Sequence, residues 1–170
     1  MDSPTPAQLR KLVGIGNYQF GHDVGNALFN PKVGIQCSRK TGRIRYVYTQ
    51  GQLVATLRPK DGCLALTTYG ASIILSKISK PPNTVAIQND VSEAVRSGGD
   101  AFAKHVLRAD PELRPADEAI VTDENGTLLG VGRAVLSGAE MPEFKRGVAV
   151  KLRRGVDEAI QKDDEDDELL

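Results

Sequence analysis

The sequence contains no tryptophan and only two cysteines, Cys37 and Cys63. Neither cysteine has a second thiol or a histidine at the C-x-x-C or H-x-x-x-H spacing of a zinc site, so we expect no bound metal and two reduced thiols. No apolar run approaches the ~20 residues that a membrane-spanning helix needs. The first residues, MDSPTPAQLR, lack the basic and then apolar pattern of a signal peptide. These absences predict a cytoplasmic protein with no membrane partner.

Motifs that indicate catalysis are also missing. The sequence has no Gly-x-Ser-x-Gly elbow, no Gly-x-x-x-x-Gly-Lys-Ser/Thr loop and no pair of histidines at helical spacing. His22 and His105 are isolated, and a histidine in an alternating run, such as His105, is more often structural than catalytic. We expect the acids of the loop DPELRPADE to be solvated, namely Asp110, Glu112, Asp117 and Glu118. The sequence therefore predicts no catalytic residues and no cofactor.

Basic and acidic residues are equal in number, with 22 of each, but they are unevenly distributed. Residues 1–83 hold eleven Lys and Arg against three acids, and residues 84–156 hold ten against eleven. Residues 157–170 hold one lysine and eight acids, and this composition predicts a disordered acidic tail. The basic front half, masked in the net charge by that tail, is typical of a protein that binds a polyanion.

Apolar periodicity predicts a mixed unit of helices and strands over residues 1–82. Thr5-Pro6-Ala7-Gln8 has the cap, the proline and the returning glutamine of a helix start. A second short helix is expected around Val24 to Leu28. After an antiparallel sheet, Thr67 or Thr68 is expected to cap a third helix.

From Lys32 the apolar period changes to two, which predicts a hairpin turning at Arg39-Lys40-Thr41-Gly42. Ile44, Tyr46 and Tyr48 are expected on its apolar face. The opposite face and the turn form a possible secondary basic patch, made of Arg39, Lys40, Arg43 and Arg45. Further strands are expected near residues 53–57 and 63–66.

Pro81-Pro82-Asn83 cannot continue a helix and marks a boundary. Beyond it, strands are expected at residues 84–88, 102–107, 118–122, 128–136 and 148–152. Asp90 and Glu93 are expected to cap a short helix that Gly98 ends. Five short strands with two helical interruptions predict a small, partly closed barrel over residues 83–156. The expected fold class is α+β, with an α/β domain containing an antiparallel sheet before the barrel.

The stretch SGGDAFAKHV suggests a binding loop. Gly98 and Gly99 accept positive φ and allow backbone N–H groups to approach a phosphate, while Lys104 supplies charge. Phe102 offers a stacking face, although we expect it to point into the core of an aromatic-poor barrel.

Cations also gather around the last strand, where alternation places Lys151 and Arg153 on an outer face. Arg133 stands between two small residues, Gly132 and Ala134, which would let a ligand backbone approach its guanidinium.

Residues 83–156 resemble a PUA domain, the small RNA-binding barrel of pseudouridine synthases and archaeosine transglycosylases. The likeness rests on SGGDAFAKHV, RPADEAIV, the ENG turn, LLGVGRAVLSGAEM and RGVAVKLRRG. The segments NYQFG, CSRKTGRIRYVY, GQLVATLRPKDG and LTTYGASIIL are similar to the domain that precedes PUA in archaeal tRNA-guanine transglycosylases. The large catalytic barrel of those enzymes has no counterpart in this sequence.

This resemblance implies a non-catalytic protein that binds structured RNA, above all tRNA, and that assists tRNA modification. It implies an RNA-binding set of Gly98, Gly99, Asp100, Phe102, Lys104, Arg133, Arg146, Lys151, Arg153 and Arg154. A separate transglycosylase catalytic subunit is a possible partner. The alternative is a translation or ribosome-assembly factor that uses the same barrel to bind rRNA or tRNA.

Overall fold

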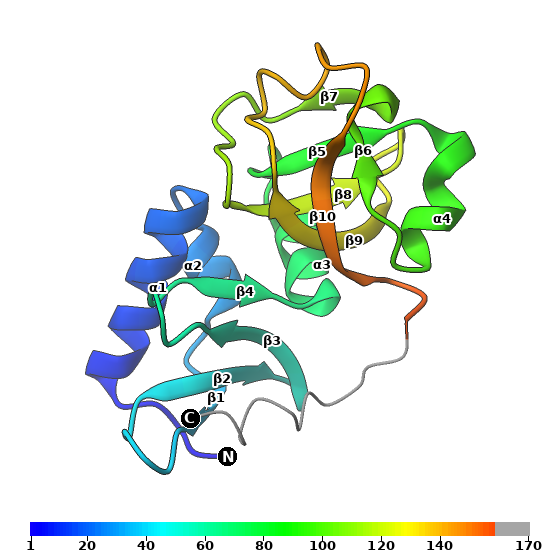
Figure 1. The fold of residues 1–170 in the computed structure, drawn as a ribbon. Coiled ribbons are helices and arrows are strands. Elements are labelled where there is room, and N and C mark those ends of the chain that lie inside the picture. The colour runs from blue at the N-terminus through cyan, green and yellow to red at the C-terminus, as the bar shows by residue number, and fades with distance from the viewer. Residues whose placement is uncertain (159–170) are drawn as a thin grey trace.

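The computed structural model describes residues 1–158 and contains two sheets, one after the other along the chain (Figure 1). The elements of the first part are α1 (Pro6–Phe20), α2 (Val24–Leu28), β1 (Gly34–Cys37), β2 (Ile44–Thr49), β3 (Gln52–Leu57), β4 (Leu64–Leu66) and α3 (Thr68–Lys77). Their four strands form sheet A, which is antiparallel in the order β1-β2-β3-β4. Within the described residues, no helix is both long enough and apolar enough to span a bilayer.

Two of the predicted helix starts are confirmed. The Thr5 side chain accepts a hydrogen bond from the Gln8 amide, and the Gln8 side-chain oxygen accepts one from the Thr5 amide. Thr67 caps α3 by accepting from the Gly70 amide at 3.0 Å. These caps satisfy amides that a helix start otherwise leaves unpaired.

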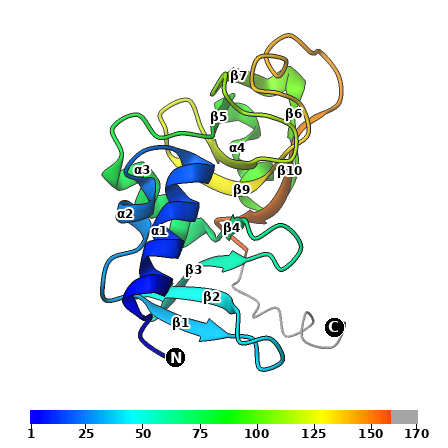
Figure 2. The ribbon, with the colours of Figure 1, turned by 90° about the vertical axis from the view of Figure 1, so that its left-hand side faces the viewer.

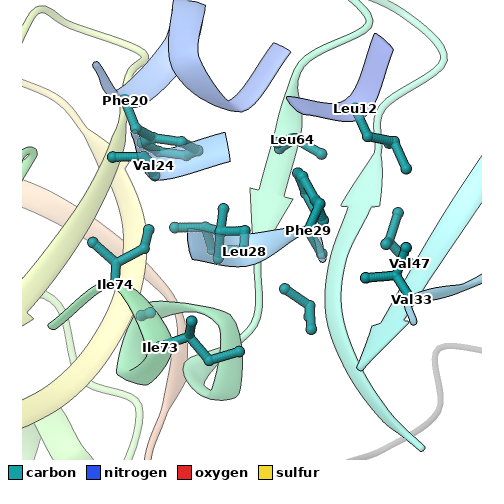
Figure 3. Packing of buried hydrophobic residues seen from close by; sticks show 14 of the residues in the cluster. Leu12, Phe20, Val24, Leu28, Phe29, Val33, Val47, Leu64, Ile73 and Ile74 are labelled. Carbon is teal, nitrogen blue, oxygen red and sulfur yellow. The ribbon is translucent and has the colours of Figure 1, made fainter. Parts of the chain in front are cut away.

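The three helices pack on one face of sheet A, where they bury a common apolar core (Figures 2 and 3). Leu12 of α1, Leu28 of α2 and Ile74 of α3 are fully buried there, and so is Val47 of β2. The core continues into the second part of the chain, because Ile120 and Val131 belong to the same cluster. The two sheets are thus joined by apolar packing.

The predicted faces of the first hairpin are wrong beyond Ile44. Gln36 pairs with Tyr46 and Cys37 with Ile44, so Arg45 is an extra residue in a β-bulge. The bulge reverses the alternation, and Val47 takes the buried position that Tyr46 was expected to fill. Tyr46 and Tyr48 therefore lie on the face of sheet A that points away from the helices.

The second part of the chain forms sheet B, with the order β6-β10-β9-β8-β5-β7. Its elements are β5 (Thr84–Ile87), α4 (Ser92–Arg96), β6 (Ala101–Phe102), β7 (Val106–Ala109), β8 (Glu118–Thr122), β9 (Leu128–Ala134) and β10 (Val148–Gly155), with 3-10 turns at Asn89–Val91 and Ala103–His105. All neighbours are antiparallel except β5 and β8. The sheet curls into a nearly closed barrel, so the expected α+β class is confirmed.

Two local predictions in this part are wrong. Val91 stands at the N-cap of α4 and makes no side-chain cap, so Asp90 and Glu93 form no capping box. The strand expected at residues 102–107 is interrupted by a 3-10 turn, because the Ala103 amide donates to Gly147 and Ala103 is buried. Phe102, in β6 directly before the turn, is 45% exposed, whereas it was expected to point into the barrel.

The predicted acidic tail lies outside the described residues from residue 159 onward. Its first two residues are held in place. The Asp157 amide donates to the Arg96 carbonyl, and the Glu158 amide donates to the Gly155 carbonyl.

Candidate nucleic-acid interface

The predicted glycine loop ends α4, and its amides are already used. The Gly98 amide donates to Val95 and the Gly99 amide to Ala94, both at 2.9 Å. Gly98 has a φ of +104°, and a Cβ there would collide with the Glu158 carboxylate. The loop therefore offers a close approach to the backbone but no free pair of amides for a phosphate.

Exposed aromatic and basic side chains meet beside this loop. Phe102 pairs with Val148, and the Ala103 amide donates to the Gly147 carbonyl, which brings the loop before β10 against the 3-10 turn. We give the name loop patch to the exposed aromatic and basic residues of these two segments, Phe102, Lys104, Phe144, Lys145 and Arg146. Phe144, at 47% exposed, was not singled out from the sequence.

A depression of about 320 Å³ opens next to the loop patch. Ile87, Val91 and Val95 contribute apolar walls, and Phe102 and Lys104 also line it. The His105 Nδ1 atom lies 3.1 Å from the Gln88 side-chain oxygen, so this histidine is held in a structural contact. The combination of an exposed ring, an apolar hollow and cations is suited to a nucleobase with its phosphate.

Asp100 serves the fold. Its carboxylate accepts a hydrogen bond from the Leu152 amide at 2.8 Å, which ties the loop to β10. The structure gives this residue a clear structural role beside its predicted role in RNA binding.

Arg133 and Lys151 form a second exposed pair. They are directly opposite each other on β9 and β10, and both side chains are exposed. A Cβ on Gly132 would stand 2.2 Å from the Lys151 carbonyl oxygen. The small residue next to Arg133 is therefore explained by the close approach of β9 and β10, rather than by room for a ligand.

Arg153 is directed into the junction between the two sheets. Leu152 pairs with Gly132 and Arg154 with Val131, so Arg153 is the extra residue of a β-bulge. Its guanidinium donates to both Glu118 oxygens, at 2.9 and 2.7 Å, and to the Leu66 carbonyl at 2.7 Å. Arg154, its neighbour, is half-buried on the same strand.

Glu118 was expected to be solvated, and this prediction is wrong, because its side chain is 1% exposed. Besides Arg153, its carboxylate accepts from the Leu66 amide at 3.0 Å and lies 3.8 Å from the Arg58 guanidinium. Nothing in DPELRPADE signals this, since the partners come from distant segments. We call Glu118, Arg153, Arg58 and Asp61 the junction cluster.

Charges from both sheets meet at this junction. The Cys63 amide is the main cause that lowers the pKa of the Asp61 carboxyl, and the guanidinium groups of Arg58 and then Arg133 lower it further. The exposed Arg133 of β9 therefore lies near the β3–β4 turn of sheet A.

The secondary basic patch lies in the β1–β2 hairpin. Arg39, Lys40 and Arg43 are exposed, and the Arg45 guanidinium lies 6.0 Å from the centre of the Tyr46 ring. Among the described residues, no group of three His, Cys, Asp or Glu side chains is arranged to hold a metal ion.

Comparison with known families defines the class of protein. Residues 83–156 match the PUA domain, and residues 10–81 match the patch-forming domain C2 of tRNA-guanine transglycosylase. The chain is thus a PUA-domain protein with a C2 domain in front, as the sequence predicted.

Curated relatives narrow the class to one family. The tRNA-guanine(15) transglycosylase of Thermoplasma volcanium is 42% identical over 155 residues, which are 90% of this chain and 24% of the relative. The enzyme of Pyrococcus furiosus is 42% identical over 147 residues, which are 86% of this chain and 25% of the relative. The chain therefore corresponds to the C-terminal, non-catalytic region of archaeal tRNA-guanine transglycosylases and spans about a quarter of their length.

Solved structures show the same fold at low sequence identity. A hypothetical protein of Pyrococcus horikoshii has a TM-score of 0.75 and 19% identity, with 92% of this chain and 95% of that chain covered. A conserved PUA-domain protein of Thermoplasma acidophilum has a TM-score of 0.67 and 16% identity, with 92% and 94% covered. The paired arrangement of the two parts thus occurs in other archaeal chains.

Proposed function

We propose that this chain is an RNA-binding module of tRNA modification that binds tRNA through the PUA domain. It would have no transferase activity of its own and would serve a catalytic chain of the transglycosylase kind. The match of both domains to the non-catalytic region of enzymes named for tRNA supports this proposal.

The observation that carries the proposal is the loop patch beside its apolar depression. Lys104, Lys145 and Arg146 are exposed beside two exposed rings, and within residues 1–158 no ion pair engages their charged groups. These cations suit phosphate contacts, and Phe102 suits contact with an unpaired base. The proposed site also includes Gly98, Gly99, Arg133, Lys151 and Arg154, whereas Asp100 and Arg153 support it through contacts within the protein.

A salt titration of binding to a tRNA transcript tests the proposal. Replacing Lys104 or Arg146 by Ala should weaken binding and lower the slope of log affinity against log salt by about one unit each. Lys11→Ala is the matched control, because Lys11 is exposed on α1, outside the proposed site. Equal slopes for all three variants and the unchanged chain would contradict the proposed site.

A second measurement separates the proposed partner from the alternative. Recovery of the chain from its own cells together with a transglycosylase-like chain supports the role in tRNA modification. Recovery with ribosomal subunits instead would favour a translation or ribosome-assembly factor.

A further inference from the structure

The two faces of sheet A differ in what covers them. Cross-strand pairing places Gly34, Gln36, Tyr46, Tyr48, Leu53, Thr56 and Ala65 on one side, which we call the outer face. None of these seven residues is buried. On the opposite side Ile35, Val47, Ala55 and Leu66 are all buried under the helices. Figure 2 shows all three helices on that covered side.

Two tyrosines dominate the outer face. They stand two residues apart on β2, and Tyr46 pairs directly with Gln36 on one side and Thr56 on the other. The Tyr48 hydroxyl donates to the Gln36 side-chain oxygen at 3.3 Å. Partial burial is the main cause that raises the pKa of Tyr48, and the neighbouring Tyr46 raises it further. Both rings keep part of their surface open to solvent, although an aromatic residue more often fills a core. Their exposure follows from the bulge at Arg45.

The surroundings of the two rings are strongly basic. Between Asp23 and Asp61 the sequence has no acidic residue, whereas it has seven basic ones, Lys32, Arg39, Lys40, Arg43, Arg45, Arg58 and Lys60. All but Lys32 lie in or beside the β1–β2 and β3–β4 turns, which are at the same end of the antiparallel sheet, and of these Arg58 is paired with Asp61 and Glu118. Charge complementarity therefore favours a polyanion over a neutral or basic partner.

We infer that the outer face of sheet A is a second RNA-binding surface, on which unpaired bases stack against Tyr46 and Tyr48 while the hairpin cations hold the phosphates. Aromatic rings on an open sheet beside a basic turn suit single-stranded RNA, because every base presents a face for stacking. A paired stem shields its bases and would gain only the phosphate contacts. This inference rests on the proposed function and extends it, because the PUA domain and sheet A would bind different parts of one RNA.

The test uses the full chain and a fluorescein-labelled twelve-nucleotide oligouridine, with an RNA duplex of the same length for comparison. Tyr46→Leu and Tyr48→Leu should each weaken oligouridine binding on the order of tenfold, while Tyr48→Phe should bind nearly as well as the unchanged chain. Duplex binding should change less than twofold. Tyr18→Leu is the control, because Tyr18 is 91% exposed on α1, a helix that packs on the face of sheet A opposite the outer face. Thermal melting verifies that each variant is folded.

Three results would overturn the inference. Leucine variants that bind oligouridine like the unchanged chain would exclude stacking, and so would a Tyr48→Phe variant as weak as Tyr48→Leu. Binding that appears only after deletion of residues 163–170 would show that the face serves the acidic end of this chain instead. To separate the two proposals, Tyr46→Leu is also measured in a Lys104→Ala background, where it should still weaken oligouridine binding on the order of tenfold.

Discussion

The two parts of the chain use their basic residues in opposite ways. In sheet A the hairpin cations stand in a stretch without acids, and they surround an open face that carries two tyrosines. In the PUA domain ten basic residues are interspersed with eleven acids, and several are engaged within the protein. Arg153 binds Glu118, and Arg96 binds Asp157. A count of cations therefore overestimates the binding surface of the second domain, where ion pairs engage several of them.

Of the substitutions that test this difference between the two domains, replacement of Glu118 should lower stability most. Glu118→Gln keeps the size of the side chain but leaves Arg153 and the Leu66 amide without a carboxylate. Because Glu118 is buried and Arg153 only partly so, we expect the free energy of unfolding to fall by about 2 to 3 kcal/mol. Urea denaturation followed by circular dichroism measures it.

Glu112→Gln provides the control for this change, since Glu112 is an exposed acid of the same loop. It should shift the unfolding free energy by less than about 0.5 kcal/mol. If both variants unfolded at the same urea concentration, Arg153 would be free for RNA, and the contrast between the domains would be lost.

Regular features of the fold follow from short-range patterns. The Thr5 and Thr67 caps and the turn at Gly126 depend on residues within a few positions of each other, and the structure contains all three. The β-bulges at Arg45 and Arg153 depend on the register of a partner strand, which no local alternation encodes. Each bulge turns a side chain toward the opposite face, so local reasoning put the tyrosines inside and Arg153 outside.

Burial of Glu118 was unpredictable for the same reason. Its partners, Leu66 and Arg153, are 52 and 35 residues away, so the loop sequence alone reads as solvated. The resemblance to the transglycosylases correctly identified the family of the RNA-binding barrel. It could not show which of its basic side chains form ion pairs within the protein. That distinction needs the pairing of strands from both sheets.

Gly132→Ala should have an intermediate effect and tests why Arg133 has small neighbours. The new Cβ would stand 2.2 Å from the Lys151 carbonyl oxygen, so β9 and β10 must separate. We expect a loss of about 2 kcal/mol, measured as a lower melting temperature. Gly14→Ala is the matched control, because its Cβ would meet open space inside α1, and it should stabilise the chain by about 0.5 to 1 kcal/mol. An unchanged melting temperature with weaker tRNA binding would restore the view that Gly132 makes room for RNA.

The smallest effect on stability is expected from breaking the exposed ion pair of Arg96 and Asp157. This change tests whether an ion pair is enough to keep a basic side chain from binding RNA. The Arg96 side chain donates to both Asp157 oxygens, at 3.0 and 2.9 Å, and this contact lowers the pKa of Asp157 below its ordinary value of 3.8. Because the folded state favours the ionised carboxyl, the contact stabilises the chain above that pH and is lost as the pH falls through the lowered pKa.

Asp157→Asn should therefore melt slightly below the unchanged chain at pH 6, and the difference should disappear as the pH falls well below 3.8. It should also shrink in 0.5 M salt, because the pair is exposed. Equal melting of the two chains at pH 6 would mean that the segment is held by the hydrogen bond from the Asp157 amide to the Arg96 carbonyl, which the substitution keeps, and not by charge. In that case the Arg96 guanidinium would remain available to bind a phosphate. The PUA domain would then have one more basic side chain for RNA binding than a count of its unpaired basic residues gives.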